Sequence, residues 1–220
     1  MNRFKQVSLA LATVGVLASS MAQAALHSKA GGTLVYDDVA NITWLADANY
    51  AKTSGYDADG LMSWSAAKTW ADNLVYGGYS DWRLPKALNA DSSGGPCMGL
   101  MGLNCTGSEM GHLFYIDGGL SPFQSITSSA ILNNYFTNMQ SDVYWSGDYW
   151  EDASWEALVF RTYDGAQSVS DYAQSNEFYA WAVHPGDVAA VPEPEVYAML
   201  LAGLGVLGVV ARRRKQESAV

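Results

Sequence analysis

Between Ser63 and Tyr76 the apolar residues recur every three to four positions, which is the period of an amphipathic helix. The residues that would share its apolar face are Trp64, Ala67, Trp70, Ala71, Leu74 and Val75. Ser63 is a favoured N-cap residue, and Gly77 and Gly78 are suited to follow a helix C-terminus. The pattern therefore predicts a helix from Ser63 to about Tyr76.

Short apolar stretches bounded by turn-forming residues predict β-strands in the rest of the chain. The predicted strands are Thr33–Tyr36, Asn41–Leu45, Val143–Ser146, Trp155–Tyr163, Ala166–Ser170 and Phe178–His184. The last of these is apolar on both faces and is predicted to be a central strand, while Asp164–Gly165 is the strongest hairpin signal. A second helix is predicted to start at the capping-box pattern Thr106–Glu109. The fold class is therefore α+β, with two helices and an antiparallel sheet.

The first 24 residues have the three parts of a secretory signal peptide. Two basic residues precede the apolar run Val7–Ala18, and the small residues Ala22 and Ala24 stand at positions −3 and −1 of a cleavage site. An uncleaved anchor helix is the alternative, but it needs a longer apolar run to cross about 30 Å of hydrocarbon. We expect residues 1–24 to be removed by cleavage between Ala24 and Ala25, which places the mature chain outside the cytoplasm.

The C-terminal segment combines three elements in a fixed order. Pro192-Glu193-Pro194 precedes the apolar run Val196–Ala211, and the basic cluster Arg212–Lys215 follows at once. By hydrophobicity alone this is a short C-terminal membrane helix whose basic end stays in the cytoplasm. The ordered set also closely resembles the PEP-CTERM sorting signal of Gram-negative bacteria.

That resemblance implies processing of residues 191–215 by an exosortase, an enzyme of the inner membrane, close to the Pro-Glu-Pro motif. Such systems usually accompany exopolysaccharide production, and the exported protein is released or attached after cleavage. The run Val196–Ala211 would then anchor the chain in the inner membrane only transiently, before the protein reaches the cell surface or the extracellular matrix. A permanent anchor with a single membrane helix is the alternative.

Composition and charge limit the classes of function that this protein can have. The chain is 49% hydrophobic and 12% aromatic, which is enough for a packed core and excludes a disordered protein. Between Ala25 and Val191 there are 19 acidic and six basic residues, a net charge of −13. The six basic residues are Lys29, Lys52, Lys68, Arg83, Lys86 and Arg161. Because nucleic-acid binding needs a basic surface, the charge argues against a nucleic-acid partner.

Two short motifs carry a family resemblance for the middle of the chain. They are Trp82-Arg83-Leu84-Pro85 and Tyr144-Trp145-Ser146. Together with Asn41–Tyr50 and Phe178–Val183, they make an ordered set that resembles the Lcl C-terminal domain family over about Thr33–Asp187. The resemblance implies a fold of the formylglycine-generating-enzyme type, which is itself C-type-lectin-like. We therefore assign residues 25–190 to one such domain.

Both motifs are interpreted as structural. Trp82 and Leu84 are predicted to lie in the core. Arg83 offers several planar donors, so we expect it to bind loop carbonyls or a carboxylate such as Asp81 or Asp187.

Cys97 and Cys105 are the only cysteines, and they enclose seven residues of a Gly- and Met-rich insertion. In an exported protein such a pair is typical of a local disulfide, and loop closure of this size stabilises by about 2–3 kcal/mol. A catalytic thiol is the alternative, since formylglycine-generating enzymes use cysteines near their substrate. The pair matches no catalytic motif, however.

Cofactor candidates are few. The histidines His27, His112 and His184 are scattered without zinc-ligand spacing, so no zinc site is predicted and His112 is interpreted as half-buried structure. Calcium is the one cofactor for which candidate ligands occur, and these are Asp57, Asp59, Asp148 and Asp152. The first two begin like a calcium loop but lack the later ligands of an EF-hand, and solvated turns are the alternative.

The leading functional hypothesis is an exported, non-enzymatic domain that binds carbohydrate at the cell surface or in an exopolysaccharide (biofilm) matrix. Aromatic rings stack on the apolar faces of sugars, and Tyr149, Trp150 and Trp155 are the candidate platform. With only scattered basic residues, we expect a neutral glycan, or an acidic polymer bridged by calcium, and not a free polyanion. The alternatives are an enzyme of formylglycine-generating or hydrolase type, and a structural matrix protein without a discrete ligand.

Overall fold

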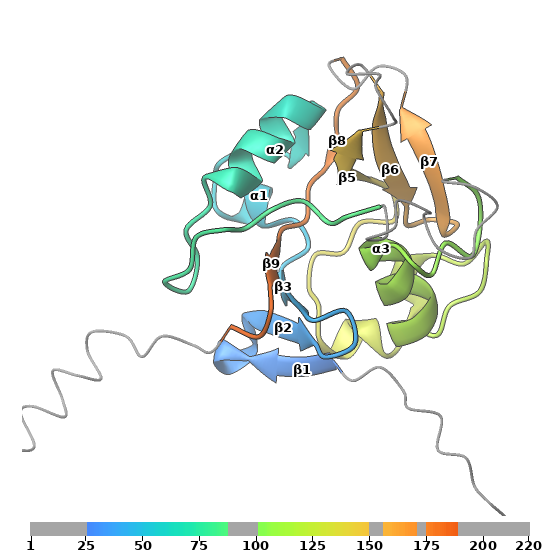
Figure 1. Cartoon of the computed structure of the whole chain (residues 1–220), viewed down its shortest axis with the longest axis horizontal. Helices are drawn as coiled ribbons and strands as arrows, with labels where there is room; N and C mark the ends of the chain where they lie inside the picture. The colour runs from blue at the N-terminus through green and yellow to red at the C-terminus, as the bar shows by residue number, and fades with distance from the viewer. Residues whose placement is uncertain (1–25, 88–100, 150–155, 171–174, 189–220) are drawn as a thin grey trace, which may run out of the picture.

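The computed structural model describes residues 26–87, 101–149, 156–170 and 175–188. They form a mixed α+β domain that has two β-sheets and only short helices (Figure 1). The predicted fold class is confirmed at this level. The predicted signal peptide and the C-terminal apolar helix lie outside the described residues.

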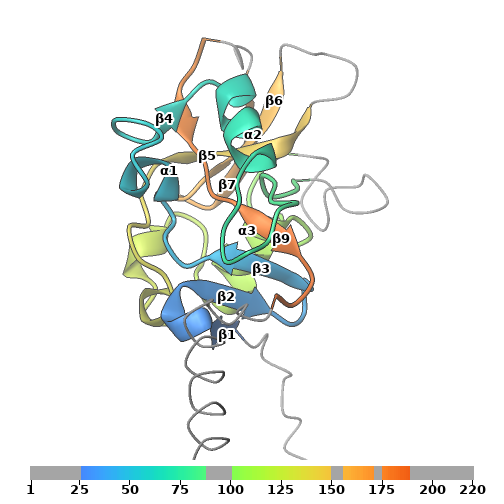
Figure 2. The ribbon, with the colours of Figure 1, turned by 90° about the vertical axis from the view of Figure 1, so that its left-hand side faces the viewer.

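A four-stranded antiparallel sheet lies at one end of the domain (Figure 2). In spatial order its strands are β1 (Leu26–Lys29), β2 (Leu34–Asp37), β3 (Ile42–Leu45) and β9 (Val183–Pro185). The two strands predicted early in the chain are therefore confirmed to within one residue at each end. They are joined by a turn in which Asp37 accepts hydrogen bonds from the backbone N–H groups of Val39 (3.0 Å) and Ala40 (2.8 Å).

A five-stranded sheet lies at the other end, next to α2 (Figure 2). In spatial order its strands are β4 (Leu61–Met62), β8 (Phe178–Tyr179), β5 (Val143–Tyr149), β6 (Ala157–Arg161) and β7 (Ala166–Ser170). All pairings are antiparallel except that of β5 with β8, which is parallel. The hairpin predicted at Asp164–Gly165 is confirmed between β6 and β7, and Gly165 there has a φ of +82°, which favours glycine.

The helices are shorter than predicted. They are α1 (Tyr50–Thr53), α2 (Trp64–Asp72), α3 (Glu109–His112), a π-helical turn η2 (Leu113–Asp117), and the 3₁₀ turns η1 (Ala30–Gly32), η3 (Ile126–Ser128) and η4 (Leu132–Asn134). Ser63 caps α2 as predicted, by accepting the N–H of Ala66 at 3.4 Å. The helix ends at Asp72, before the predicted Tyr76, and Val75, which was predicted to lie on its apolar face, is 72% exposed.

The predicted capping box at Thr106–Glu109 is wrong in detail. Ser108, not Thr106, is the N-cap of α3, and its hydroxyl accepts the N–H of Gly111 at 3.1 Å. Glu109 does not reach back to the cap, because its carboxylate binds Arg83.

The predicted central strand Phe178–His184 is also wrong, because it is two strands in two different sheets. β8 ends at Tyr179, the chain then crosses the core through Ala180–Ala182, and β9 begins at Val183. A segment buried on both sides gives the same apolar pattern whether it is a central strand or a crossing between sheets. The crossing residues are almost fully buried, and Ala182 accepts a hydrogen bond from the N–H of Leu45 at 3.1 Å.

Four tryptophans form the centre of the core, each at most 1% exposed: Trp44, Trp82, Trp145 and Trp181. Trp181 packs edge-on against Trp44 and Phe136, with ring centroids 5.0 Å away in both cases. Its indole N–H donates to the carbonyl of Leu45 at 2.8 Å, and that of Trp145 donates to Met62 at 2.7 Å. Both bonds satisfy a buried donor. The first ties the segment between the sheets to β3, and the second joins β5 to β4 within the five-stranded sheet.

Candidate functional site

The two sequence motifs meet in the core. Trp82 and Leu84 are 1% and 2% exposed, so their prediction as core residues is confirmed. Pro85 accepts the N–H of Gly147 at 2.8 Å, which ties the first motif to β5 directly after the second motif. In that second motif Ser146 uses its carbonyl to accept the indole N–H of Trp64 at 2.8 Å. Such contacts support a structural role for both motifs.

Arg83 binds a different carboxylate from those predicted. Its guanidinium donates to both oxygens of Glu109 at 2.7 Å each, and to the carbonyl of Leu84 at 3.0 Å. Asp187 is instead paired with Lys29 at 2.9 Å. The expected contact with a loop carbonyl is confirmed, whereas the carboxylate is Glu109 and neither Asp81 nor Asp187. The sequence could not show that α3 lies against this loop.

Replacing Glu109 by glutamine is expected to lower the free energy of unfolding by about 2 kcal/mol, because charge-assisted hydrogen bonds to a half-buried guanidinium are lost. Urea unfolding followed by tryptophan fluorescence measures the change. Asp72→Asn is the matched control, since Asp72 pairs with Lys68 at the surface and such pairs contribute at most about 1 kcal/mol. Equal effects of the two substitutions would show that the Arg83–Glu109 pair does not hold α3 in place.

The proposed aromatic platform falls mostly outside the described residues. Trp150 and Trp155 lie there, so the platform stays a prediction. Tyr149 is described at the end of β5, where its half-buried ring packs on Trp64 with a centroid distance of 4.1 Å. The Tyr149 ring therefore packs against the domain itself through its contact with Trp64.

The described calcium candidates bind backbone N–H groups. Asp57 accepts the N–H of Asp59 (3.0 Å) and of Gly60 (2.7 Å), and Asp148 accepts that of Ala87 (2.6 Å). Desolvation works to raise the pKa of Asp57, but these two hydrogen bonds lower it below its ordinary value. Asp152 lies outside the described residues, and calcium binding stays a prediction.

The disulfide also stays a prediction, because Cys97 is outside the described residues. Cys105 is fully buried, just before α3, and the described part of the chain contains no free cysteine. Burial in an oxidising compartment is consistent with the predicted bond.

A polar pocket of about 340 Å³ lies where α1, β8 and the segment before β5 come together. Its lining residues are Asn49, Lys52, Thr53, Asn138, Gln140 and Tyr179. The pocket thus combines three amides, a hydroxyl, an ammonium group and one aromatic ring. Its volume lies within the range of small-ligand sites.

The first wall of the pocket is fixed by a close approach of two loops. Asn49 is 5% exposed and donates its amide N–H to the carbonyl of Asp59 at 3.3 Å, while its amide oxygen is buried without a hydrogen-bond partner. Gly60 allows this contact, because a Cβ at that position would lie 1.9 Å from the amide oxygen of Asn49. Lys52 and Thr53 follow on α1 and are exposed.

The opposite wall is fixed by hydrogen bonds between the segment before β5 and buried side chains. Gln140 donates its backbone N–H to the hydroxyl of Tyr144 at 3.0 Å, and its carbonyl accepts the hydroxyl of Thr162 at 2.7 Å. Its side chain donates to the carbonyl of Asn138 at 2.7 Å. Tyr179 is half-buried, with its ring 5.5 Å from that of Tyr144. Both walls are therefore anchored on the core.

Burial, and then the charges of Asp142 and Asp59, raise the pKa of Tyr179. The Tyr179 hydroxyl therefore stays protonated at neutral pH and can donate a hydrogen bond. The same carboxylates place negative charge beside the pocket.

Besides the polar pocket, the structure contains a second feature that the sequence did not reveal, which is a group of two buried aspartates and a histidine. Within the described residues, one set of ligating side chains lies close enough to hold a metal ion: Asp37, His112 and Asp117, whose ligand atoms are all within 4.8 Å of one another. Burial, and then the neighbouring carboxylate of Asp37, raise the pKa of Asp117 to about 8. His112 is half-buried, as predicted.

Comparison with known families confirms both resemblances found in the sequence. Residues 33–184 match the Lcl C-terminal domain family, and the chain belongs to that family. Residues 190–215 match the PEP-CTERM protein-sorting motif. The protein is thus an exported one, sorted by exosortase to the cell surface of a Gram-negative bacterium.

No curated protein and no solved structure matches the chain at a significant level. Among the described residues, no helix has the length and apolar character that a membrane span requires. The predicted apolar run Val196–Ala211 falls outside them and within the matched sorting motif.

Proposed function

We propose that the domain binds neutral carbohydrate in the polar pocket lined by Asn49, Lys52, Thr53, Asn138, Gln140 and Tyr179, and that it serves adhesion at the cell surface or in an exopolysaccharide matrix. The observation that carries the proposal is the composition of this pocket. An amide group has donors as well as an acceptor, which suits the hydroxyl pairs of a sugar ring, and Asn49 and Gln140 each use only one N–H on a backbone carbonyl. The ring of Tyr179 offers an apolar face for the sugar C–H groups.

The charge of the domain supports a neutral ligand. The segment from Ala25 to Val191 carries a net charge of −13, and Lys52 is the only basic residue that lines the pocket. Asp142 and Asp59 lie close enough to act on Tyr179, so an anionic group would meet negative charge at the pocket. Sulfated or carboxylated polymers are bound by clusters of basic residues, which this pocket lacks.

The pocket chemistry also supports binding over catalysis. Its six lining residues include no carboxylate, imidazole or thiol, which are the usual acids, bases and nucleophiles of hydrolases. A C-type-lectin-like arrangement of the domain would agree with this function, and we keep it as part of the proposal. An enzyme of formylglycine-generating type and a structural matrix protein without a ligand are the alternatives.

A glycan array probed with the full chain, in the presence and absence of chelator, tests the proposal. We expect neutral glycans to be bound, and the double variant Lys52→Ala/Gln140→Ala to bind them at least about tenfold more weakly, because hydrogen bonds to a charged donor and to an amide are lost. Lys68→Ala is the matched control, since Lys68 is an exposed lysine on α2 away from the pocket.

Either of two outcomes would contradict the proposal. The first is that the wild-type chain binds no glycan under either condition. The second is that the pocket variant binds as tightly as the wild type. Tight retention on heparin at low salt with chelator present would separately contradict the charge argument.

A further inference from the structure

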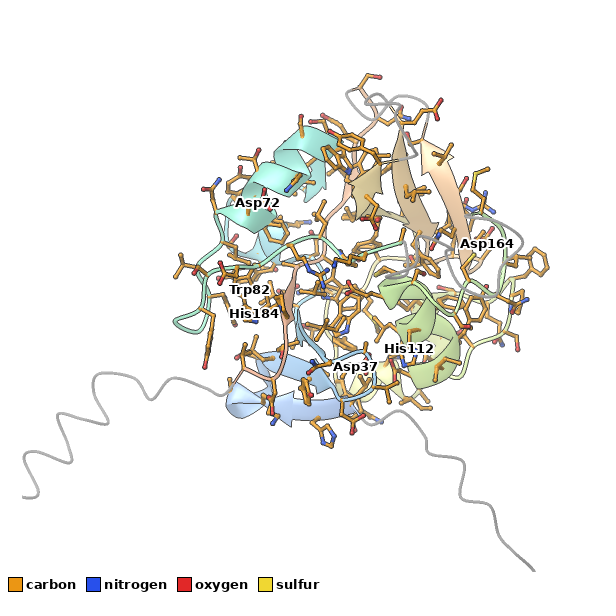
Figure 3. All side chains as sticks on the ribbon, in the orientation of Figure 1. Asp37, Asp72, Trp82, His112, Asp164 and His184 are labelled. Atoms are coloured by element: carbon orange, nitrogen blue, oxygen red, sulfur yellow. The ribbon has the colours of Figure 1, made fainter. Side chains whose placement is uncertain are left out.

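Three ligating side chains meet between the four-stranded sheet and the π-helical turn. Asp37 ends β2, His112 ends α3, and Asp117 ends η2. Figure 3 shows Asp37, on the hairpin of the four-stranded sheet, turned toward the helix that carries His112. The group is thus built from two segments that the fold brings together.

Four polar atoms of this group are buried without a hydrogen-bond partner. They are Oδ2 of Asp37, Nε2 of His112, and both carboxylate oxygens of Asp117. Asp37 and Asp117 are 0% and 2% exposed, respectively. Buried polar atoms are nearly always partnered in folded proteins, so four orphaned atoms in one small group require an explanation.

The local backbone brings the side chains of His112 and Asp117 close to each other. His112 and Asp117 are five residues apart, which on an α-helix would place them about 140° apart around the axis. The π-helical turn, closed by the N–H of Gly118 on the carbonyl of Leu113 at 2.8 Å, brings them to the same side, with Nε2 of His112 3.9 Å from Oδ2 of Asp117. Such π-turns are frequent at functional sites.

The charge of the group is not balanced by the protein. In the described part of the chain Asp37 makes no ion pair, and Asp117 pairs only with His112. Two such closely spaced buried carboxyls cannot both be ionised at neutral pH without a cation, and buried charges in proteins are paired or coordinate metals. A divalent cation would neutralise both carboxylates and give an orphaned atom of each of the three side chains a partner.

We propose that Asp37, His112 and Asp117 bind a divalent transition-metal ion, zinc being the expected one, and that this ion ties the β2–β3 turn to the π-helical turn. An imidazole together with two carboxylates favours zinc or a similar transition metal over calcium and magnesium, which prefer oxygen ligands alone. Three protein ligands leave one tetrahedral position for water. The proposal is independent of carbohydrate binding.

Metal content of the purified full chain tests this inference. The chain is expressed with its own export signal, purified in mild detergent through a tag that contains no histidine, stripped with chelator and reloaded with zinc. We expect about one zinc ion per chain. His112→Gln and Asp117→Asn should each weaken zinc binding by more than about tenfold, since even supporting residues of metal sites have effects of that size.

His27→Gln is the matched control. His27 also contacts an aspartate, Asp38, at 3.0 Å, but this pair is exposed at the surface, so zinc binding should be unchanged. Zinc content at background level in the wild type, or equal binding by all variants, would overturn the proposal. A wild type that binds no zinc, together with an Asp117→Asn variant of equal or higher melting temperature, would indicate a proton shared by Asp37 and Asp117 instead.

X-ray absorption at the zinc edge is a second test, and because it uses the wild-type chain it does not depend on any variant being folded. The proposal predicts scattering from one imidazole with the remaining ligands oxygen. Sulfur ligands, or more than one imidazole, would place the metal elsewhere and overturn the assignment.

Discussion

Replacing Trp181 by alanine should lower the free energy of unfolding by about 4–5 kcal/mol, because the substitution leaves a large cavity and an unpaired carbonyl at Leu45. Trp181 is 1% exposed, and its ring contacts Trp44, Phe136 and Tyr144. It lies in the segment that crosses from the five-stranded to the four-stranded sheet. The loss should therefore weaken both sheets at once and lower the melting temperature by about 10–15 °C.

Urea unfolding and thermal melting measure this effect. Phe123→Ala is the control, because that ring is 77% exposed and its removal should change stability by no more than about 0.5 kcal/mol. Trp181→Phe should be milder than Trp181→Ala, since most of the ring volume is kept. A Trp181→Ala variant that is as stable as Phe123→Ala would mean that the two sheets do not share one core.

Replacing Glu193 by alanine within the Pro-Glu-Pro motif is expected to abolish processing by exosortase in a host that has this enzyme. The matched PEP-CTERM motif spans residues 190–215 and includes Pro192, Glu193 and Pro194. Intact-mass measurement should show wild-type surface material that begins at Ala25 and has lost Arg212–Lys215. The variant should retain Arg212–Lys215 and stay in the membrane fraction.

Glu217→Ala is a control for this experiment, because Glu217 lies beyond the matched motif and should not affect processing. Wild-type surface material that still carries Arg212–Lys215 would contradict cleavage near the motif. Normal processing of the Glu193→Ala variant would show that the motif's acid is not what the enzyme recognises.

Local signals in the sequence predicted local elements well. The N-cap at Ser63 and the hairpin at Asp164–Gly165 depend on side-chain and backbone preferences within a few residues, and both are confirmed. The crossing segment Phe178–His184 could not be recognised, because an apolar pattern reports burial and not the partner strand. The carboxylate that binds Arg83 was missed because only the fold places Glu109 beside it.

The candidate pocket could not be predicted because its walls are far apart in the sequence. Asn49, Gln140 and Tyr179 come from three segments, and each is an ordinary polar residue without a motif. The group of Asp37, His112 and Asp117 was missed because the spacing of five residues suggests opposite sides of an α-helix. Only the π-helical turn changes that geometry.

Proton–nitrogen correlation spectra of the full chain, titrated with the neutral glycan that binds best on the array, test the central claim most directly. The pocket contains side-chain amides, whose signals report on hydrogen bonding to a ligand. Our account predicts that the amide signals of Asn138 and Gln140 shift together on titration, while those of the exposed Asn133 do not. Unchanged signals from the two pocket amides, with shifts confined to the end of β5 around Tyr149, would place binding elsewhere and contradict it.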